Sequence, residues 1–175
     1  MEPTAVAEIA ISPSFRRIFE AEFGYVCRAL RRLGVVPGDV EDVAQEVFIT
    51  VHDQMSAYEP DRPLKPWLFS FALRFAANYR RLARHRTRSA EDADEQPVSG
   101  HDGKTAARDL VLRALEQLEF ERRVVFVMHD LEGFGAPELA TELKTPLNTV
   151  YSRLRLARED FREAVTELQR GGSAS

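Results

Sequence analysis

Apolar residues recur every three or four positions along most of this chain, the spacing that places them on one face of an α-helix. The first segment with this spacing runs from residue 12 to residue 33. A second begins near Asp39, which together with Asp42 occupies the two positions of a capping box. After a proline-containing loop over residues 58–66, a third segment extends to residue 88. The pattern therefore predicts three successive helices in the first half of the chain.

Residues 89–105 interrupt this pattern, because they are acidic, contain glycine and proline, and include almost no large apolar side chains. A segment of this composition cannot bury enough surface to order itself, so we expect a flexible linker. Helical spacing returns in residues 106–118, 121–131, 137–143 and 147–168. We therefore predict an all-α fold in which two small helical domains, residues 12–88 and 106–170, are joined by this linker.

A tight turn joins the last two predicted helices, with Thr145 as N-cap and Pro146 at the first helical position. We expect Leu147 to belong to the apolar stripe of the final helix. The N-terminal part of the same helix also carries Asn148, Thr149, Tyr151, Ser152, Arg153, Arg155 and Arg158. Such a pair is a helix-turn-helix, whose second helix can enter the major groove and pair arginine and asparagine with base edges. An ordinary antiparallel helix pair has the same spacing, so the motif alone leaves both interpretations open.

Charge is strongly segregated along the chain, although the formal net charge is only -4. Between residues 62 and 88 there is no acidic residue, and the basic residues are Arg62, Lys65, Arg74, Arg80, Arg81, Arg84, Arg86 and Arg88. Phosphates require uncompensated positive charge, and unstacked bases require aromatic or guanidinium planes. The same stretch carries aromatic residues four positions apart, at Trp67, Phe71, Phe75 and Tyr79. We assign the arginines to nucleic acid and expect most of the aromatic side chains to pack in a core.

The preceding segment has the opposite charge, because residues 38–61 contain no lysine or arginine. Its apolar stripe consists of Val40, Val43, Ala44, Val47, Phe48 and Val51. Asp42, Gln45, Glu46 and Asp53 lie off that stripe. A solvated acidic face or charge balance against the basic helix would explain them. Neighbouring surfaces of opposite charge also suggest two different partners.

Several kinds of function have no residues to support them. Cys27 is the only cysteine, so an intrachain disulfide is excluded and a reducing, cytoplasmic setting is expected. The four histidines lack metal-ligand spacing, and no glycine-rich phosphate loop is present. No apolar run approaches the ~20 residues of a membrane span. We therefore expect a binding protein rather than an enzyme, with no catalytic residue, metal, cofactor or membrane insertion.

The order of these parts resembles the extracytoplasmic-function group of bacterial RNA polymerase sigma factors. DVEDVAQEVFITVHDQMSAY is similar to the polymerase-binding helix of region two in that family. WLFSFALRFAANYRRLARHR resembles the helix that reads and melts the minus-ten element. The segment from LEQLEFERR to LRLARE is similar to region four, which reads the minus-thirty-five element.

This resemblance implies core RNA polymerase and promoter DNA as partners, and it leaves open whether an anti-sigma factor also binds. It places contacts with core polymerase at Asp39, Glu41, Asp42, Gln45 and Glu46. It places minus-ten contacts at Arg62, Lys65, Arg74, Asn78, Arg80, Arg81 and Arg84, with residues 58–65 as the loop that captures an extruded base. It places minus-thirty-five contacts at the seven residues of the final helix given above.

Three departures from the family pattern affect these expectations. Arg74 stands where many relatives have asparagine, so minus-ten preference is expected to differ. Glu119-Phe120 replaces a usual Pro-Pro. Lys144 replaces the glycine usual in the helix-turn-helix turn, so we expect that turn to have a different shape. Two alternatives remain: a stand-alone helix-turn-helix regulator of duplex DNA, and a helical protein-interaction module. The first does not explain the acidic helix, and the second does not explain the arginines.

Overall fold

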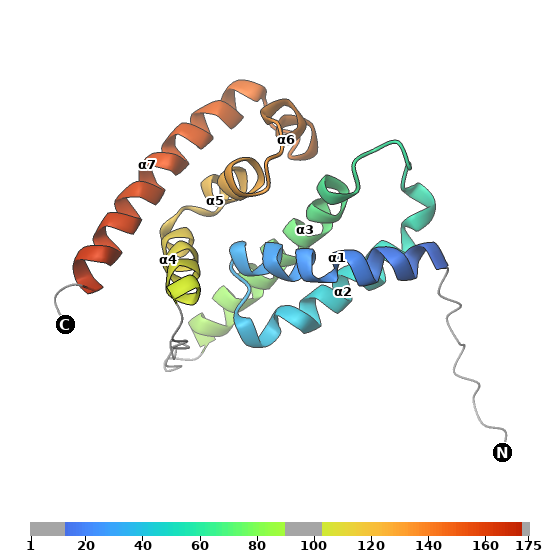
Figure 1. Ribbon diagram of the computed structural model, residues 1–175, viewed down its shortest axis with the longest axis horizontal. Helices are drawn as coiled ribbons and strands as arrows, with labels where there is room; N and C mark the ends of the chain where they lie inside the picture. Colours follow the sequence, from blue (N-terminus) through green and yellow to red (C-terminus); the bar gives the residue numbers. More distant parts are fainter. Residues whose placement is uncertain (1–12, 90–102, 173–175) are drawn as a thin grey trace, which may run out of the picture.

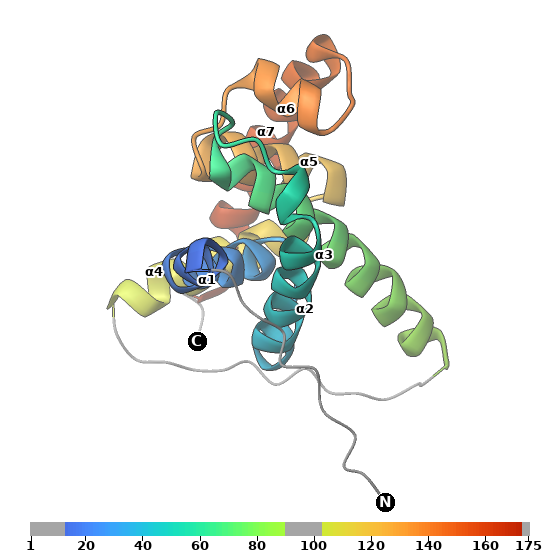
Figure 2. The ribbon, with the colours of Figure 1, turned by 90° about the vertical axis from the view of Figure 1, so that its right-hand side faces the viewer.

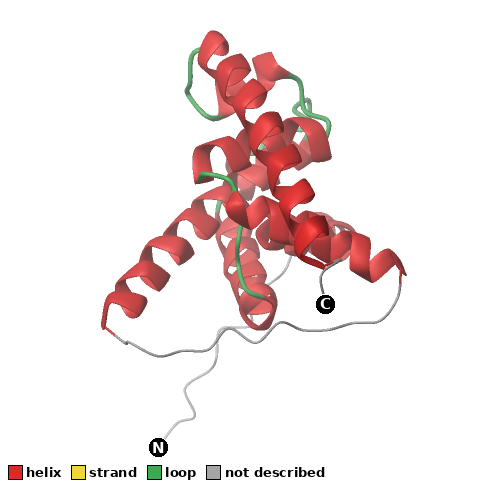
Figure 3. Ribbon diagram, turned by 90° about the vertical axis from the view of Figure 1, so that its left-hand side faces the viewer, coloured by secondary structure: helices red, strands yellow, loops and turns green. Residues whose placement is uncertain are grey.

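The structure is a computed structural model that describes residues 13–89 and 103–172. Within these ranges all regular secondary structure is helical, as Figure 3 shows, so the predicted all-α fold of two domains is confirmed. The first domain consists of α1 (Pro13–Arg32), η1 (Pro37–Asp39), α2 (Val40–Asp53), η2 (Met55–Ala57) and α3 (Leu64–Ser89). The second consists of α4 (Gly103–Gln117), α5 (Phe120–Phe126), the π-helix η3 (Val127–Leu131), α6 (Ala136–Glu142) and α7 (Leu147–Gly172).

The first domain is built by α1, α2 and α3, which pack against one another (Figure 1). All six residues of the predicted apolar stripe on α2 are buried, which confirms that stripe. Phe48 from this stripe packs against Phe15, Phe19 and Phe23 of α1, with ring centroids 5.0 to 6.4 Å apart. The aromatic side chains of α3 also turn inward as predicted, because Phe71 is buried and Trp67 lies edge-on to it at 4.9 Å.

In the second domain α7 is the longest element and packs against α4, α5 and α6. Phe126 of α5 stacks on Phe161 of α7 at 4.6 Å. The single helix expected at residues 121–131 is instead α5 followed by η3. Glu119 caps α5 by accepting a hydrogen bond from the backbone N–H of Glu121 at 3.3 Å, so a carboxylate begins this helix where the family pattern has proline.

Two helices end in the same six-residue motif, in which the chain leaves the helix through a left-handed residue. After α1 this residue is Gly34, with φ 104°, and the backbone N–H of Val35 returns to the carbonyl of Leu30 at 3.0 Å. After α6 it is Lys144, with φ 49°, and Thr145 N–H returns to the carbonyl of Ala140 at 3.0 Å. Lys144 therefore adopts the left-handed conformation that glycine adopts most easily. The turn has the same hydrogen-bond pattern as the one at Gly34, so the different turn shape that we expected is not found.

The two domains lie against each other and share one continuous hydrophobic core, and Figure 2 shows α6 above α1 and α2. Phe69 of α3 meets Phe134 of the second domain edge-on at 5.9 Å. Arg32 forms an ion pair with Glu132, and Arg62 pairs with Glu142 at 2.9 Å. The order of the domains matches the prediction, but the contact between them was not predicted.

Four local predictions need correction. The expected linker is shorter at both ends, because Ser89 belongs to α3 and residues 103–105 to α4; its remaining residues, 90–102, lie outside the described ranges. The loop expected at residues 58–66 ends earlier, since α3 begins at Leu64. Asp39 occupies the N-cap position of α2 but makes no capping hydrogen bond there; its carboxylate accepts one from the Tyr79 hydroxyl at 2.6 Å. The last helix begins at Leu147, one residue after the predicted start.

Candidate nucleic-acid and protein interfaces

The outer face of α2 is acidic and exposed. Glu41, Asp42, Gln45 and Glu46 are all exposed, so four of the five predicted protein-binding residues lie at the surface. The fifth, Asp39, is half-buried and held by Tyr79. Ile49 lies one turn beyond Gln45 on the same face and is 63% exposed. An apolar side chain surrounded by acidic and polar neighbours is the arrangement expected at the centre of a protein interface.

The exposed side of α3 is basic. Arg74, Asn78 and Arg81 lie at positions i, i+4 and i+7, and all three are exposed. The Arg81 guanidinium donates to the Asn78 side-chain oxygen at 2.8 Å, and the Arg74 guanidinium lies 4.6 Å from the centre of the Phe71 ring. These contacts fix the direction of the side chains without neutralising their charge. Arg84 is exposed beside this face.

Three other predicted nucleic-acid residues of the first domain have different surroundings. Arg62 is held by Glu142, and Arg80 lies 4.6 Å over the Phe120 ring, so both contact the second domain. Burial lowers the pKa of the Arg80 guanidinium, and the charge of Arg84 adds to this effect. Lys65 is exposed at the start of α3, with its ammonium 5.4 Å from the centre of the Tyr25 ring. Arg62 therefore has a carboxylate partner 80 residues away, although residues 62–88 contain no acidic residue.

A hollow of about 160 Å³ lies beside the Arg62–Glu142 contact. Trp67 and Pro63 line it from the first domain, and Glu138 lines it from α6. The loop expected to capture a base therefore faces the second domain in this arrangement.

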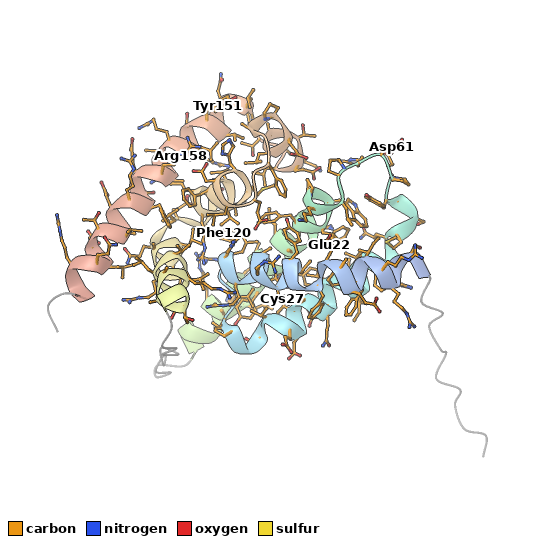
Figure 4. All side chains as sticks on the ribbon, in the orientation of Figure 1. Glu22, Cys27, Asp61, Phe120, Tyr151 and Arg158 are labelled. Atoms are coloured by element: carbon orange, nitrogen blue, oxygen red, sulfur yellow. The ribbon has the colours of Figure 1, made fainter. Side chains whose placement is uncertain are left out.

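On α7 the predicted residues divide into two groups. Asn148, Tyr151, Ser152 and Arg155 are exposed at positions i, i+3, i+4 and i+7, which lie on one face of the helix. Figure 4 shows Tyr151 near the start of α7, at the outer edge of the molecule, and Arg158 further along the helix. Thr149 is half-buried, and Arg153 and Arg158 form ion pairs with other elements of the second domain.

The carboxylates that hold these two arginines come from the preceding elements. Arg153 forms an ion pair with Glu121 of α5. Arg158 donates Nε and Nη2 to the two carboxylate oxygens of Asp130, each at 2.7 Å. This hydrogen-bonded pair lowers the pKa of the Asp130 carboxyl and raises that of Arg158. Of the three predicted arginines on α7, Arg155 is the one whose carboxylate partner lies on α7 itself, at Glu159.

Comparisons with known proteins identify the family. The family model described as "Sigma-70 region 2" matches residues 18–86, and the one described as "Sigma-70, region 4" matches residues 108–161. Together they span more than two-thirds of the chain. The chain is also 28% identical over 151 residues to the ECF RNA polymerase sigma-E factor of Escherichia coli K12, covering 78% of each protein.

The chain belongs to the sigma-70 family, in its extracytoplasmic-function group.

Another sequence relative and two solved structures are also similar to this sigma factor. RNA polymerase sigma factor NccH of Alcaligenes xylosoxydans is 27% identical over 154 residues, which cover 83% of each chain. In fold, the sigma factor resembles RpoE of Bartonella quintana, solved in complex with the anti-sigma factor NepR, with a TM-score of 0.75, 18% identity, and 89% and 98% of the two chains covered. It also resembles CnrH, solved with the cytosolic domain of CnrY, with a TM-score of 0.64, 24% identity, and 90% and 91% covered.

The predicted function is thereby confirmed: the protein is a sigma factor that directs RNA polymerase to promoters, and the stand-alone regulator is not favoured. Region 2 contains both the acidic face of α2 and the basic face of α3, and region 4 contains the exposed face of α7. Across the described ranges, no helix combines the length and the apolar character that a membrane span requires.

Sequence reasoning missed two surface residues that belong to these faces. Ile49 was not singled out, although its position four residues after Gln45 places it on the acidic face. Leu147 was assigned to the buried stripe of the last helix, but it is 38% exposed. The position of Ile49 relative to the buried Val47 and Val51 was a signal that could have identified it, whereas the spacing of Leu147 from the buried Val150 gave no such signal.

Proposed function

We propose that this sigma factor uses three separate surfaces in transcription initiation. The acidic face of α2 binds core RNA polymerase, the basic face of α3 engages the minus-ten element, and the exposed face of α7 reads the minus-thirty-five element. The observation that carries this proposal is the placement of an acidic and a basic face on adjacent helices of one small domain. Two exposed faces of opposite charge suit two partners of different chemistry.

The partner of α2 is a protein rather than DNA, because DNA would be repelled by Asp42, Glu46 and Glu41. The exposed Ile49 supports this assignment, since protein interfaces place apolar groups at the centre and polar groups at the rim. Asp39 contributes indirectly, because its hydrogen bond with Tyr79 ties the start of α2 to α3. A groove with basic edges and an apolar floor on core polymerase would complement this surface.

The partner of α3 is promoter DNA around the minus-ten element. Arg74, Asn78 and Arg81 present guanidinium and amide groups along one exposed face, which suits phosphates and unpaired bases. Arg62 and Arg80 belong to the same proposed site, but their contacts with Glu142 and Phe120 occupy them in this arrangement. Full engagement of the minus-ten element therefore requires the two domains to move apart.

The proposed division of the chain keeps the predicted order of region two, linker and region four, with region two extending to Ser89 at the end of α3 and region four beginning at Gly103 at the start of α4. The work of the protein is binding alone: contacts with phosphates and bases offset the few kcal/mol needed to unstack each base step. We place this activity in the cytoplasm, where core polymerase and promoters are found. The complex of a relative with the anti-sigma factor NepR supports a regulator of that kind as a further partner.

Run-off transcription with purified core polymerase tests the proposal. Core polymerase alone should give no promoter-specific transcript, and addition of the full chain should produce one from a promoter selected from genomic fragments. DNA binding by the chain that is independent of core polymerase, without any transcript, would instead support a stand-alone regulator.

A further inference from the structure

Two large hydrophobic side chains are exposed together at the start of α7. Leu147 is 38% exposed and Tyr151 is 52% exposed, and no other large hydrophobic residue in the described part of the second domain is exposed. They are four residues apart, so they lie on the same face of the helix in successive turns. Neither belongs to the hydrophobic core or to the hydrophobic residues packed against it. The fold of the domain therefore does not explain why these positions are apolar.

The side chains around this pair are polar and point toward solvent. Asn148, Ser152 and Arg155 are exposed beside Leu147 and Tyr151. The Ser152 hydroxyl donates to the Asn148 carbonyl at 3.0 Å, which leaves its oxygen able to accept a hydrogen bond. The face that α7 can present to a duplex is thus mixed, with two apolar groups among polar groups.

Only one feature of the major groove is apolar. Its base edges present hydrogen-bond donors and acceptors at every base pair, whereas the single hydrocarbon group is the 5-methyl of thymine. Against most other base edges, an apolar pair would shield hydrogen-bond donors and acceptors of the bases from water without replacing the lost hydrogen bonds. Such contacts are unfavourable. Thymine is the base whose groove edge complements Leu147 and Tyr151.

We propose that Leu147 and Tyr151 contact thymine 5-methyl groups and so select thymine in the minus-thirty-five element. This inference rests on the proposed function of α7. Leu147 is thereby added to the residues of α7 that recognise DNA, and the role of Tyr151 is specified as contact with a thymine methyl group. The expected consequence is a minus-thirty-five element that contains thymine at one or two positions facing the start of α7.

Deoxyuridine tests this directly, because it differs from thymidine only by the absence of the methyl group. The minus-thirty-five element is first selected with holoenzyme reconstituted from the full chain and core polymerase. Each thymidine in it is then replaced by deoxyuridine, and holoenzyme affinity is measured. Loss of one contacted methyl should weaken binding about fourfold, the effect of removing one buried methyl-sized group. In Leu147→Ala or Tyr151→Ala holoenzyme, the preference for thymidine over deoxyuridine should disappear at the corresponding position.

Arg155→Ala provides the matched control, because it changes an exposed residue of the same face but no apolar contact. It should weaken binding at all sites while leaving the preference for thymidine intact. If Arg155→Ala weakens binding but the wild type binds thymidine and deoxyuridine equally, the methyl contact is wrong and the proposed function of α7 stands. If neither Arg155→Ala nor any base change alters binding, the assignment of α7 itself fails. Loss of core polymerase binding by Leu147→Ala would show that the apolar pair contacts protein and would overturn the inference.

Discussion

Arg123 is the only charged side chain that is buried among the described residues, with 1% of its surface exposed. Its Nε donates to the backbone carbonyl of Arg32, the last residue of α1, so a residue of the second domain caps a helix of the first. The Nη2 group has no hydrogen-bond partner in the structure. Burial lowers the pKa of the guanidinium to about 10, and the positive charge of Arg80 contributes to this effect. Helix C-termini attract cations, but the Arg123 guanidinium at the end of α1 is almost completely shielded from solvent, which disfavours its charge.

Replacement of Arg123 by methionine keeps an unbranched side chain of similar length and removes the charge. The lowered pKa corresponds to a penalty on the order of 3 kcal/mol for holding the charged form in this site. The lost hydrogen bond to the Arg32 carbonyl offsets about 1.5 kcal/mol of that gain. We therefore expect Arg123→Met to raise the free energy of unfolding by about 1 to 2 kcal/mol. Urea denaturation followed by circular dichroism and by Trp67 fluorescence measures this change.

The pH dependence gives an independent check. Because the folded-state pKa is lowered, the penalty is complete at neutral pH and is relieved as pH rises past 10. The stability difference between the variant and the wild type should therefore shrink above pH 10. Arg122→Met is the matched control, since Arg122 is adjacent but pairs with Asp160 at the surface; it should lower stability slightly. A loss of 2 kcal/mol or more in Arg123→Met would refute the reasoning and show that the buried charge stabilises the domain contact.

Backbone strain, a single hydrogen bond and a cluster of arginines each allow a further test by mutation. Lys144→Gly should raise the free energy of unfolding by about 0.5 to 1 kcal/mol, because φ 49° strains any residue with a Cβ; an unchanged thermal midpoint would contradict this. Tyr79→Phe should lower it by about 1 to 2 kcal/mol, because the Asp39 carboxylate loses its hydrogen bond; a neutral result would mean that water replaces the hydroxyl fully. Triple alanine replacement of Arg80, Arg81 and Arg84 should reduce promoter opening by holoenzyme more than duplex binding. Normal permanganate reactivity at the minus-ten element would remove these arginines from the proposed site.

Local periodicity predicted most of the fold. The six apolar residues of the α2 stripe are all buried, because a regular helix with one clear apolar face has one way to pack. The aromatic side chains of α3 share one face by the same periodicity and pack toward the core as predicted. Leu147 also follows the periodicity but is exposed, because the first turn of a helix can project beyond the body of its domain, and apolar character alone does not reveal this.

Contacts between the domains could not be read from the sequence. Arg62 and Glu142 are 80 residues apart, and Arg80 meets Phe120 across the predicted linker. Arg123 appears in the sequence as one more basic residue of an amphipathic segment, and nothing nearby indicates that its guanidinium is buried against α1. Asp39 shows the same limit at short range: its position satisfied the capping rule, but tertiary contact with Tyr79 determined its hydrogen bond.

The most direct test of the account is the affinity of core RNA polymerase for a variant altered on the acidic face of α2. Gln45→Ala combined with Glu46→Lys changes two exposed residues, so the free energy of unfolding should move by only about 0.5 kcal/mol or less. Glu163→Lys, the same charge reversal at an exposed position of α7, serves as the control. We predict that the double variant folds normally but loses at least about tenfold in affinity for core polymerase, equivalent to about 1.4 kcal/mol, while Glu163→Lys binds as the wild type does. Wild-type affinity in the folded double variant would contradict the assignment of α2 as the polymerase-binding surface.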